Sequence, residues 1–319
     1  MASLDIVYSY IIQISTILGI IFDCSTAFII VKFTPKQSRS IAFMLLVIIG
    51  WTLIADVFFA LAHTFPMEER NCFRLDGLLS GAMRSEIYGH VWMCVCILAA
   101  VNVAVGLFVS FQYRYMIISH SSKIHLCWMI PYGISLHLLI SGVYIWTYYY
   151  SVLPLDDYPT NLEKQNLFCY ATEGTHIHLP SWFLFGLFGV VALSLITFVL
   201  LSYYQLHKNK HIIAEETARM EREYLWNLIT LSAIPIIFGG IPLMVFSVSF
   251  LVPNWSMAQI VNVVSILIAL DYGPWMCIAC LVMFKPYREA LKSGFGRVCQ
   301  CCLKRRMSVH DEYVHEDNE

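Results

Sequence analysis

Seven long apolar runs, separated by short polar connections, dominate the chain. They fall at about 7–33, 41–65, 88–112, 125–146, 181–205, 224–251 and 259–284. Each run reaches the roughly 20 residues that a helix needs to cross a bilayer. Lipid-exposed helices satisfy their backbone hydrogen bonds internally, whereas open strands do not. The pattern therefore predicts an all-α membrane protein: a seven-transmembrane helix bundle over 1–298, including a short juxtamembrane helix, and a tail over 299–319.

Composition agrees with this class. Of the 319 residues, 58% are hydrophobic and 13% are charged, whereas charged residues make up about 25% of soluble domains. No connection is long enough to form a separate domain. We expect contacts with membrane lipids and none with nucleic acid, and nothing in the pattern indicates an oligomeric state.

The basic residues predict the orientation of the bundle. Sixteen of the 20 Lys and Arg lie in the first, third and fifth loops and the tail, and the other four are Arg70, Arg74, Arg84 and Lys164. Basic residues concentrate on the cytoplasmic side of membrane proteins. We therefore expect the N-terminus outside and the C-terminus inside. The first apolar run has no basic residue before it and no A-x-A-like cleavage site, so it is interpreted as a span rather than a signal peptide.

Several residues in the connections are candidates for covalent modification. Only Cys72 and Cys169, of the 11 cysteines, fall in predicted outer loops, so one disulfide is expected there. Asn254 begins an Asn-Trp-Ser glycosylation acceptor in another predicted outer loop. The tail carries Cys299, Cys301 and Cys302 beside three basic residues. This pattern suits S-palmitoylation, with free thiols as the alternative.

Four polar residues lie at similar depth inside the predicted spans: Asp23, Asp56, Asn102 and Asp271. No Lys or Arg is available within the spans to pair with the three acids. One interpretation is a polar cluster that holds water or a monovalent cation near Asp56 and Asp271. A proton or ion pathway is a second, and unrelated protonated acids are a third. No other cofactor is expected, and we find no metal-ligand spacing.

The predicted outer half of the bundle is rich in aromatic rings. Candidate ligand-binding residues there are Tyr88, His90, Trp92, Trp182, Phe185 and Asn262. Such residues suit an apolar pocket with a few polar groups. They also suit an interfacial aromatic belt.

Helix-breaking residues gather in the last two spans. The sixth contains Pro235, Gly239, Gly240 and Pro242, and the seventh contains Gly273-Pro274. These are hinges or static kinks. After the seventh span, one face of the segment FKPYREALKSGFGRV carries apolar residues and suits a short helix lying in the inner interface.

Short motifs resemble a known family. The first span runs into FTPKQSRS, the second contains Trp51 and Asp56 and ends with Phe65-Pro66, and Arg114 follows FVSFQY. The seventh span closes with Phe-Lys-Pro-Tyr-Arg from Phe284. These features resemble the nematode serpentine chemoreceptors, most closely the class H and class I branches of the Str superfamily.

The resemblance implies a G-protein-coupled receptor in the plasma membrane of sensory neurons, which detects odorants or other small molecules. Arg114 would then face a heterotrimeric G protein at the inner end of the third helix. The residues expected to accompany it are Tyr113, Tyr115, Lys123, Arg219 and Arg222. Gln112 and Tyr113 precede Arg114, so the acid that adjoins this arginine in rhodopsin-like receptors is missing. Cys72 also lies too far before Arg114 to match the third-helix cysteine of those receptors.

Two other functions remain open at this point, a secondary transporter and a ligand-gated channel, both using the intramembrane acids. The lack of an internal repeat argues against common transporter architectures. The charge pattern opposes channels that have an inside N-terminus. An enzyme is not expected, because the sequence holds no H-E-x-x-H, G-x-S-x-G or nucleotide-binding loop.

Overall fold

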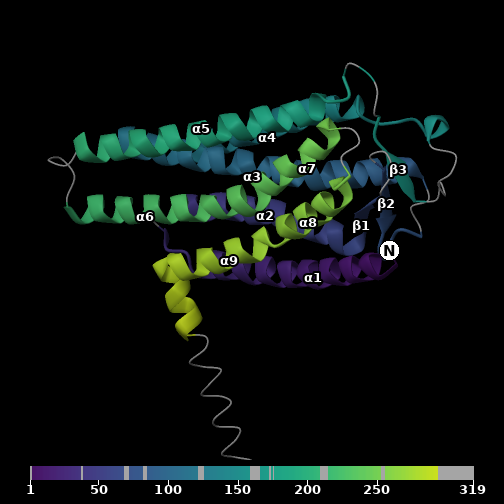
Figure 1. Ribbon diagram of the computed structural model, residues 1–319. Coiled ribbons are helices and arrows are strands. Elements are labelled where there is room, and N and C mark those ends of the chain that lie inside the picture. The colour runs from purple at the N-terminus through teal and green to yellow at the C-terminus, as the bar shows by residue number, and fades with distance from the viewer. Residues whose placement is uncertain are drawn as a thin grey trace, which may run out of the picture.

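Seven membrane-length helices form one bundle, as the apolar runs predicted (Figure 1). The structure is a computed structural model that describes residues 2–36, 39–67, 72–81, 85–120, 126–158, 166–171, 174, 176–208, 215–252 and 256–293. We name the two ends of the bundle by their contents. The sheet end carries three short strands and the start of the first helix, and the Arg114 end is opposite.

The first five spans are continuous helices. They are α1 (Ala2–Phe33), α2 (Arg39–Leu61), α3 (Glu86–His120), α4 (Leu126–Tyr149) and α5 (Leu179–Lys208). Helix α3 lies at the centre, where Ala99 and Val101 are fully buried. Gly106 lets α3 approach α2 closely, because a Cβ there would lie 3.1 Å from the Ile48 side chain.

The sixth and seventh spans are interrupted where proline and glycine were noted. The sixth consists of α6 (Glu215–Ile234), a π-helical turn η3 (Pro235–Gly240) and α7 (Ile241–Leu251). Pro235 has no N–H to donate, and the N–H of Ile241 donates to the carbonyl of Ile236, five residues back. The seventh consists of α8 (Ala258–Leu270) and α9 (Tyr272–Met283), with Asp271 at the break.

A further helix follows α9 over 285–293 and turns away from the bundle (Figure 1). Phe284 separates the two because its backbone is extended. The Tyr287 hydroxyl lies 2.9 Å from Thr34 Oγ1, which ties this helix to the end of α1. Burial raises the pKa of the Tyr287 phenol, so it remains a neutral hydrogen-bonding group.

A small sheet corrects the expected end of the second span. The apolar run continues to residue 65, but α2 ends at Leu61 and His63–Pro66 form strand β1. Antiparallel strands β2 (Cys72–Asp76) and β3 (Leu167–Cys169) complete a sheet in the order β1-β2-β3. Strands β2 and β3 belong to the second and fourth loops. The backbone groups of the three strands therefore pair with one another at the end of the bundle, and no strand has to span the lipid. Hydropathy alone cannot distinguish this buried strand from a helix end.

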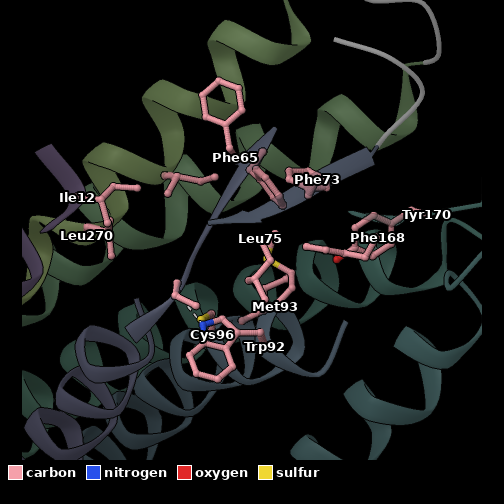
Figure 2. Packing of buried hydrophobic residues seen from close by; sticks show 14 of the residues in the cluster. Ile12, Phe65, Phe73, Leu75, Trp92, Met93, Cys96, Phe168, Tyr170 and Leu270 are labelled. Carbon is pink, nitrogen blue, oxygen red and sulfur yellow. Dashed lines mark hydrogen bonds between the residues drawn. The ribbon is translucent and has the colours of Figure 1, made fainter. Parts of the chain in front are cut away.

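The sheet packs onto the bundle and forms part of its largest apolar cluster. Figure 2 shows Leu75 of β2 close to Trp92 and Met93 of α3, with Phe73 on the same strand and Phe168 on the neighbouring β3. Gly89 in α3 is required beneath it, since a Cβ there would lie 2.2 Å from the Phe168 ring.

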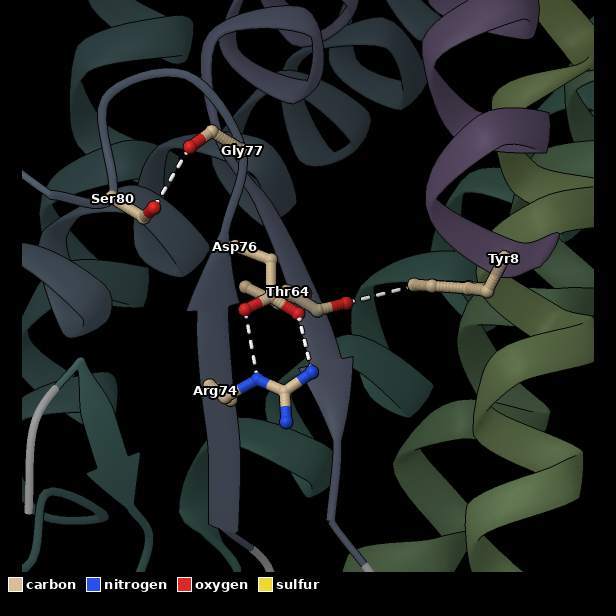
Figure 3. Close-up of polar contacts among 6 residues, drawn as sticks. All are labelled: Tyr8, Thr64, Arg74, Asp76, Gly77 and Ser80. Carbon is tan, nitrogen blue, oxygen red and sulfur yellow. Dashed lines mark hydrogen bonds and ion pairs between the residues drawn. The ribbon is translucent and has the colours of Figure 1, made fainter. Parts of the chain in front are cut away.

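Covalent and polar contacts hold the sheet in place. Cys72 and Cys169 face each other across β2 and β3 and form a disulfide. The Tyr8 hydroxyl donates to the Thr64 carbonyl at 2.8 Å, joining α1 to β1 (Figure 3). Arg74 pairs with Asp76 along the same strand, also at 2.8 Å. Burial lowers the pKa of His63 in β1, so its ring stays neutral at pH 7.

We expect the Cys72→Ser variant to unfold at a lower temperature than the wild type. The disulfide closes a separation of 97 residues, and removing such a native link costs about 2–5 kcal/mol. Thermal unfolding of the purified receptor, followed by tryptophan fluorescence, measures this effect. Cys24→Ser, which removes an exposed free cysteine, is the matched control. Equal unfolding temperatures for all three proteins would contradict the role given to the disulfide.

Candidate functional site

An ion pair joins α3 to α6 at the Arg114 end. Arg114 Nη1 donates to Glu221 Oε2 at 3.1 Å. The guanidinium also lies over the Tyr224 ring, 4.9 Å from its centroid. Arg114 is only 6% exposed. Because little water reaches the guanidinium, these contacts must stabilise its charge.

The position of Arg114 differs from the expectation that it ends the third helix. Helix α3 continues to His120, which places Arg114 inside the helix and against α6. The acid missing from positions 112 and 113 has a counterpart in Glu221. Glu221 could not be paired with Arg114 from the sequence, because the two lie 107 residues apart in the chain.

The other residues expected at a coupling surface are in different environments. Arg219 and Arg222 are exposed on α6, and Tyr115 is half-buried. Tyr113 does not belong to an exposed surface, because it is buried in an apolar cluster with Met44 and Met129. Lys123 lies outside the described residues.

Two of the intramembrane acids lie side by side. Asp23 accepts hydrogen bonds from Thr52 Oγ1 at 2.9 Å and from Cys277 Sγ at 3.0 Å. Asp56 is 4% exposed, and its Oδ2 atom is buried without a hydrogen-bond partner among the described residues. Gly19 makes room for Asp56, since a Cβ there would lie 2.0 Å from Oδ2. The two carboxyl groups share one buried site, since a Cβ on Gly273 would lie 3.7 Å from Asp56 Oδ2 and 3.9 Å from Asp23 Oδ1.

Asn102 and Asp271 do not complete a common cluster with this pair. The Asn102 amide donates to Ser141 Oγ at 3.0 Å, and its carbonyl lies 2.6 Å from His137 Nδ1. Asn102 therefore faces α4. Asp271 is exposed, and its carboxylate accepts a hydrogen bond from Ser15 on α1. Depth along a helix could be predicted from the sequence, but the face of each helix could not.

Two adjoining cavities lie inside the bundle, and we call them together the central cavity. The part nearer the sheet end has a volume of about 80 Å³ and is bordered by Thr64 and Asp56. The part between α3, α5 and η3 measures about 200 Å³. Ala100, Gly239 and Tyr272 line both parts. The walls are mainly apolar, as in sites for small hydrophobic ligands.

Tyr272 connects the central cavity with the helix break in the sixth span. A Cβ on Gly239 would lie 3.6 Å from the Tyr272 ring. The Tyr272 hydroxyl is buried without a hydrogen-bond partner among the described residues. A molecule in the cavity would thus contact both η3 and the start of α9. Gly239 and Gly240, which the sequence marked as helix-breaking residues, line this cavity.

Of the six residues expected to bind a ligand, only Phe185 lines the central cavity. Tyr88 and Trp182 are exposed at the rim, where aromatic belts lie. His90 and Trp92 are buried structural groups. His90 packs against Tyr170 beneath the sheet, and Trp92 Nε1 donates to the Ala62 carbonyl at 2.8 Å. Asn262 is buried in α8 and lines neither part of the cavity.

Asn254 and the three tail cysteines Cys299, Cys301 and Cys302 lie outside the described residues. Within the described ranges, no group of three or more His, Cys, Asp or Glu side chains could hold a metal ion.

Comparison with known proteins identifies the family. No curated protein matches the chain. A crystal structure of squid rhodopsin is similar, with a TM-score of 0.66 and 14% sequence identity, over 93% of this chain and 88% of that one. At this identity the likeness establishes a rhodopsin-like fold. The family model of the serpentine type 7TM GPCR chemoreceptor Srh matches residues 3–297. The chain is therefore an integral membrane protein that belongs to the Srh family of G-protein-coupled chemoreceptors.

Proposed function

We propose that this receptor binds a small apolar molecule in the central cavity and activates a heterotrimeric G protein at the Arg114 end. The observation that carries the proposal is the Arg114–Glu221 ion pair, which holds α6 against α3. The π-helical turn and the cavity lie farther along the same sixth span. Membership of a receptor family favours this function over a transporter or a channel.

The orientation proposed here places the Arg114 end in the cytoplasm of a sensory neuron and the sheet end outside the plasma membrane. The excess of basic residues at the Arg114 end supports this direction. The disulfide supports it too, because Cys72 and Cys169 lie at the sheet end and disulfides persist in oxidising surroundings.

The chemistry of the cavity suggests the class of ligand. Aliphatic and aromatic side chains form most of its walls, and Asp56, Thr64, Ser265 and Tyr272 supply most of the polar atoms. A compact apolar odorant with one or two polar groups matches this lining. A large or highly charged ligand would leave its polar groups without partners.

Activation would require α6 to move away from α3. Opening this end breaks the Arg114–Glu221 contact and exposes the guanidinium to a partner. A ligand shifts the equilibrium only if it binds the open state more tightly than the closed one. Contacts with Tyr272 and Gly239, beside the π-helical turn, provide a means of such discrimination.

We further propose that the Asp23–Asp56 pair binds a monovalent cation in the resting receptor. Two carboxylates that share a buried site are stabilised by a proton or a cation between them. The unpartnered Oδ2 atom of Asp56 supports this role.

Replacing Glu221 by Gln should raise basal nucleotide exchange several-fold. Loss of a charge-assisted contact worth about 1 kcal/mol shifts an equilibrium roughly fivefold. The assay measures G-protein activation in a heterologous cell at matched surface expression, with and without an odorant panel. Glu223→Gln, an exposed neighbour on α6, should leave the basal rate unchanged.

Arg114→Ala should abolish responses in the same assay, because it removes the proposed contact between the guanidinium and the G protein. Persistent responses in Arg114→Ala would remove that contact. An unchanged basal rate in Glu221→Gln would show that the ion pair does not restrain the receptor.

Enlarging Ala100 to Leu should weaken the response to an active odorant by about tenfold or more, because the added side chain occupies both parts of the cavity. The measurement is the odorant concentration for half-maximal G-protein activation. Gly142→Leu in α4 is the control, since a Cβ there meets no atom within 4 Å. Equal potency in the two variants would place the ligand elsewhere.

Sodium chloride should raise the unfolding temperature of the wild-type receptor relative to the same concentration of choline chloride. Asp56→Asn should lose this sodium-specific increase, since it removes the carboxylate with the unpartnered oxygen. The proposed cation site would be wrong if both salts stabilise the wild type equally.

A further inference from the structure

A carboxylate on the outer surface of the seventh span has no role in the proposed signalling path. Asp271 lies between the 13-residue α8 and the 12-residue α9, at the middle of the span. It is exposed, unlike Asp23 and Asp56. Its neighbours at helical spacing on this surface are the exposed apolar residues Val264, Ile268, Trp275 and Ile278. Asp271 is thus an acid within a lipid-facing apolar stripe.

Helix α1 lies alongside α8 and α9 and continues this surface (Figure 1). Ser15 Oγ donates to Asp271 Oδ1, and this is the hydrogen bond that the described residues provide to the carboxylate. Ile11 and Leu18 flank Ser15 on its own helix face and are 44% and 47% exposed. We call the surface made by Ile11, Ser15, Leu18, Ile268, Asp271 and Trp275 the Asp271 seam.

Lipid offers no hydrogen bonds to the remaining oxygen of Asp271. Ionisable groups within spans usually face the bundle interior or water, where they find a partner. The local structure therefore favours a cationic or hydrogen-bond-donating group that approaches from the lipid side.

The chain itself supplies no such cation. None of its 20 Lys and Arg lies near the middle of an apolar run, so a second copy would bring no basic residue to the centre of the bilayer. Charge complementarity instead points to a different membrane protein. Its transmembrane helix would carry a Lys or Arg at mid-depth, with apolar residues on either side.

We propose that the Asp271 seam is a docking surface for a partner transmembrane helix with a central basic residue. The helix lies along α1 and the seventh span, and its cation pairs with the Asp271 carboxylate. Trp275, which is 53% exposed, packs against its apolar side. The seam is separate from the central cavity, so docking does not require an odorant.

The test uses a synthetic helix of about 24 leucines and alanines with one central Lys, reconstituted with the full-length receptor in phosphatidylcholine vesicles. Energy transfer between the labelled receptor and the labelled helix reports association. We expect the Lys helix to bind about fivefold or more tightly than the same helix with Leu at the centre. Asp271→Asn should bring the two helices to equal affinity.

Two further variants separate pairing from misfolding. Asp271→Glu keeps the carboxylate and should retain the preference for Lys. Asp56→Asn removes a buried acid and should also retain it. The proposal is overturned if the wild type does not distinguish the helices, or if Asp271→Asn keeps the preference. Asp271-dependent energy transfer between receptor copies, without any preference for the Lys helix, would instead make a second copy the occupant.

Discussion

Backbone hydrogen bonding in a medium without water constrains the whole structure. Each span must satisfy its N–H and C=O groups within itself, so seven apolar runs form seven helical spans. The strands lie at one end, where the loops supply their partners and a disulfide joins them. Irregular backbone inside the bundle is confined to a few places. The π-helical turn borders the central cavity, and the break at Asp271 borders the seam with α1.

The same constraint relates the two functional regions. The π-helical turn η3 departs from regular α-helix, yet its backbone still forms hydrogen bonds, such as the one from Ile241 to Ile236. Bending the sixth span there therefore requires less free energy than bending a regular helix. Tyr272 packs against the turn from the seventh span, in one apolar cluster with Leu231. The sixth span thus carries part of the cavity wall in η3 and, in α6, the acid Glu221 that pairs with Arg114. A small displacement at η3 would change the distance between α6 and α3 at the Arg114 end.

Much of this architecture could be predicted from residue patterns. Run length and hydropathy predicted seven spans, and loop placement singled out Cys72 and Cys169. The Gly239-Gly240 pair indicated where the sixth span departs from regular helix. These features are local, or they follow from the thickness of a bilayer.

The errors concern how helices are rotated and which distant residues meet. Asp56 and Asp271 have similar depth, but the first is buried in the bundle and the second is exposed on its surface. Strand β1 lies within the second apolar run, and it pairs with β2, which pairs in turn with β3 from a different loop. Glu221 can be recognised as the partner of Arg114 only once α6 is known to lie against α3. The aromatic residues Tyr88 and Trp182 have the composition of a pocket, yet they lie at the exposed rim.

In the resting receptor α6 lies against α3, and we propose that it swings away when a G protein binds. The most direct measurement is the distance between spin labels at Ser119 in α3 and Met220 in α6, in lipid nanodiscs. The spectrum is recorded with and without nucleotide-free heterotrimeric G protein. We expect a longer distance in the complex and a return to the resting distance when GTP is added. Nucleotide exchange on the G protein without any change in this distance would contradict this proposal.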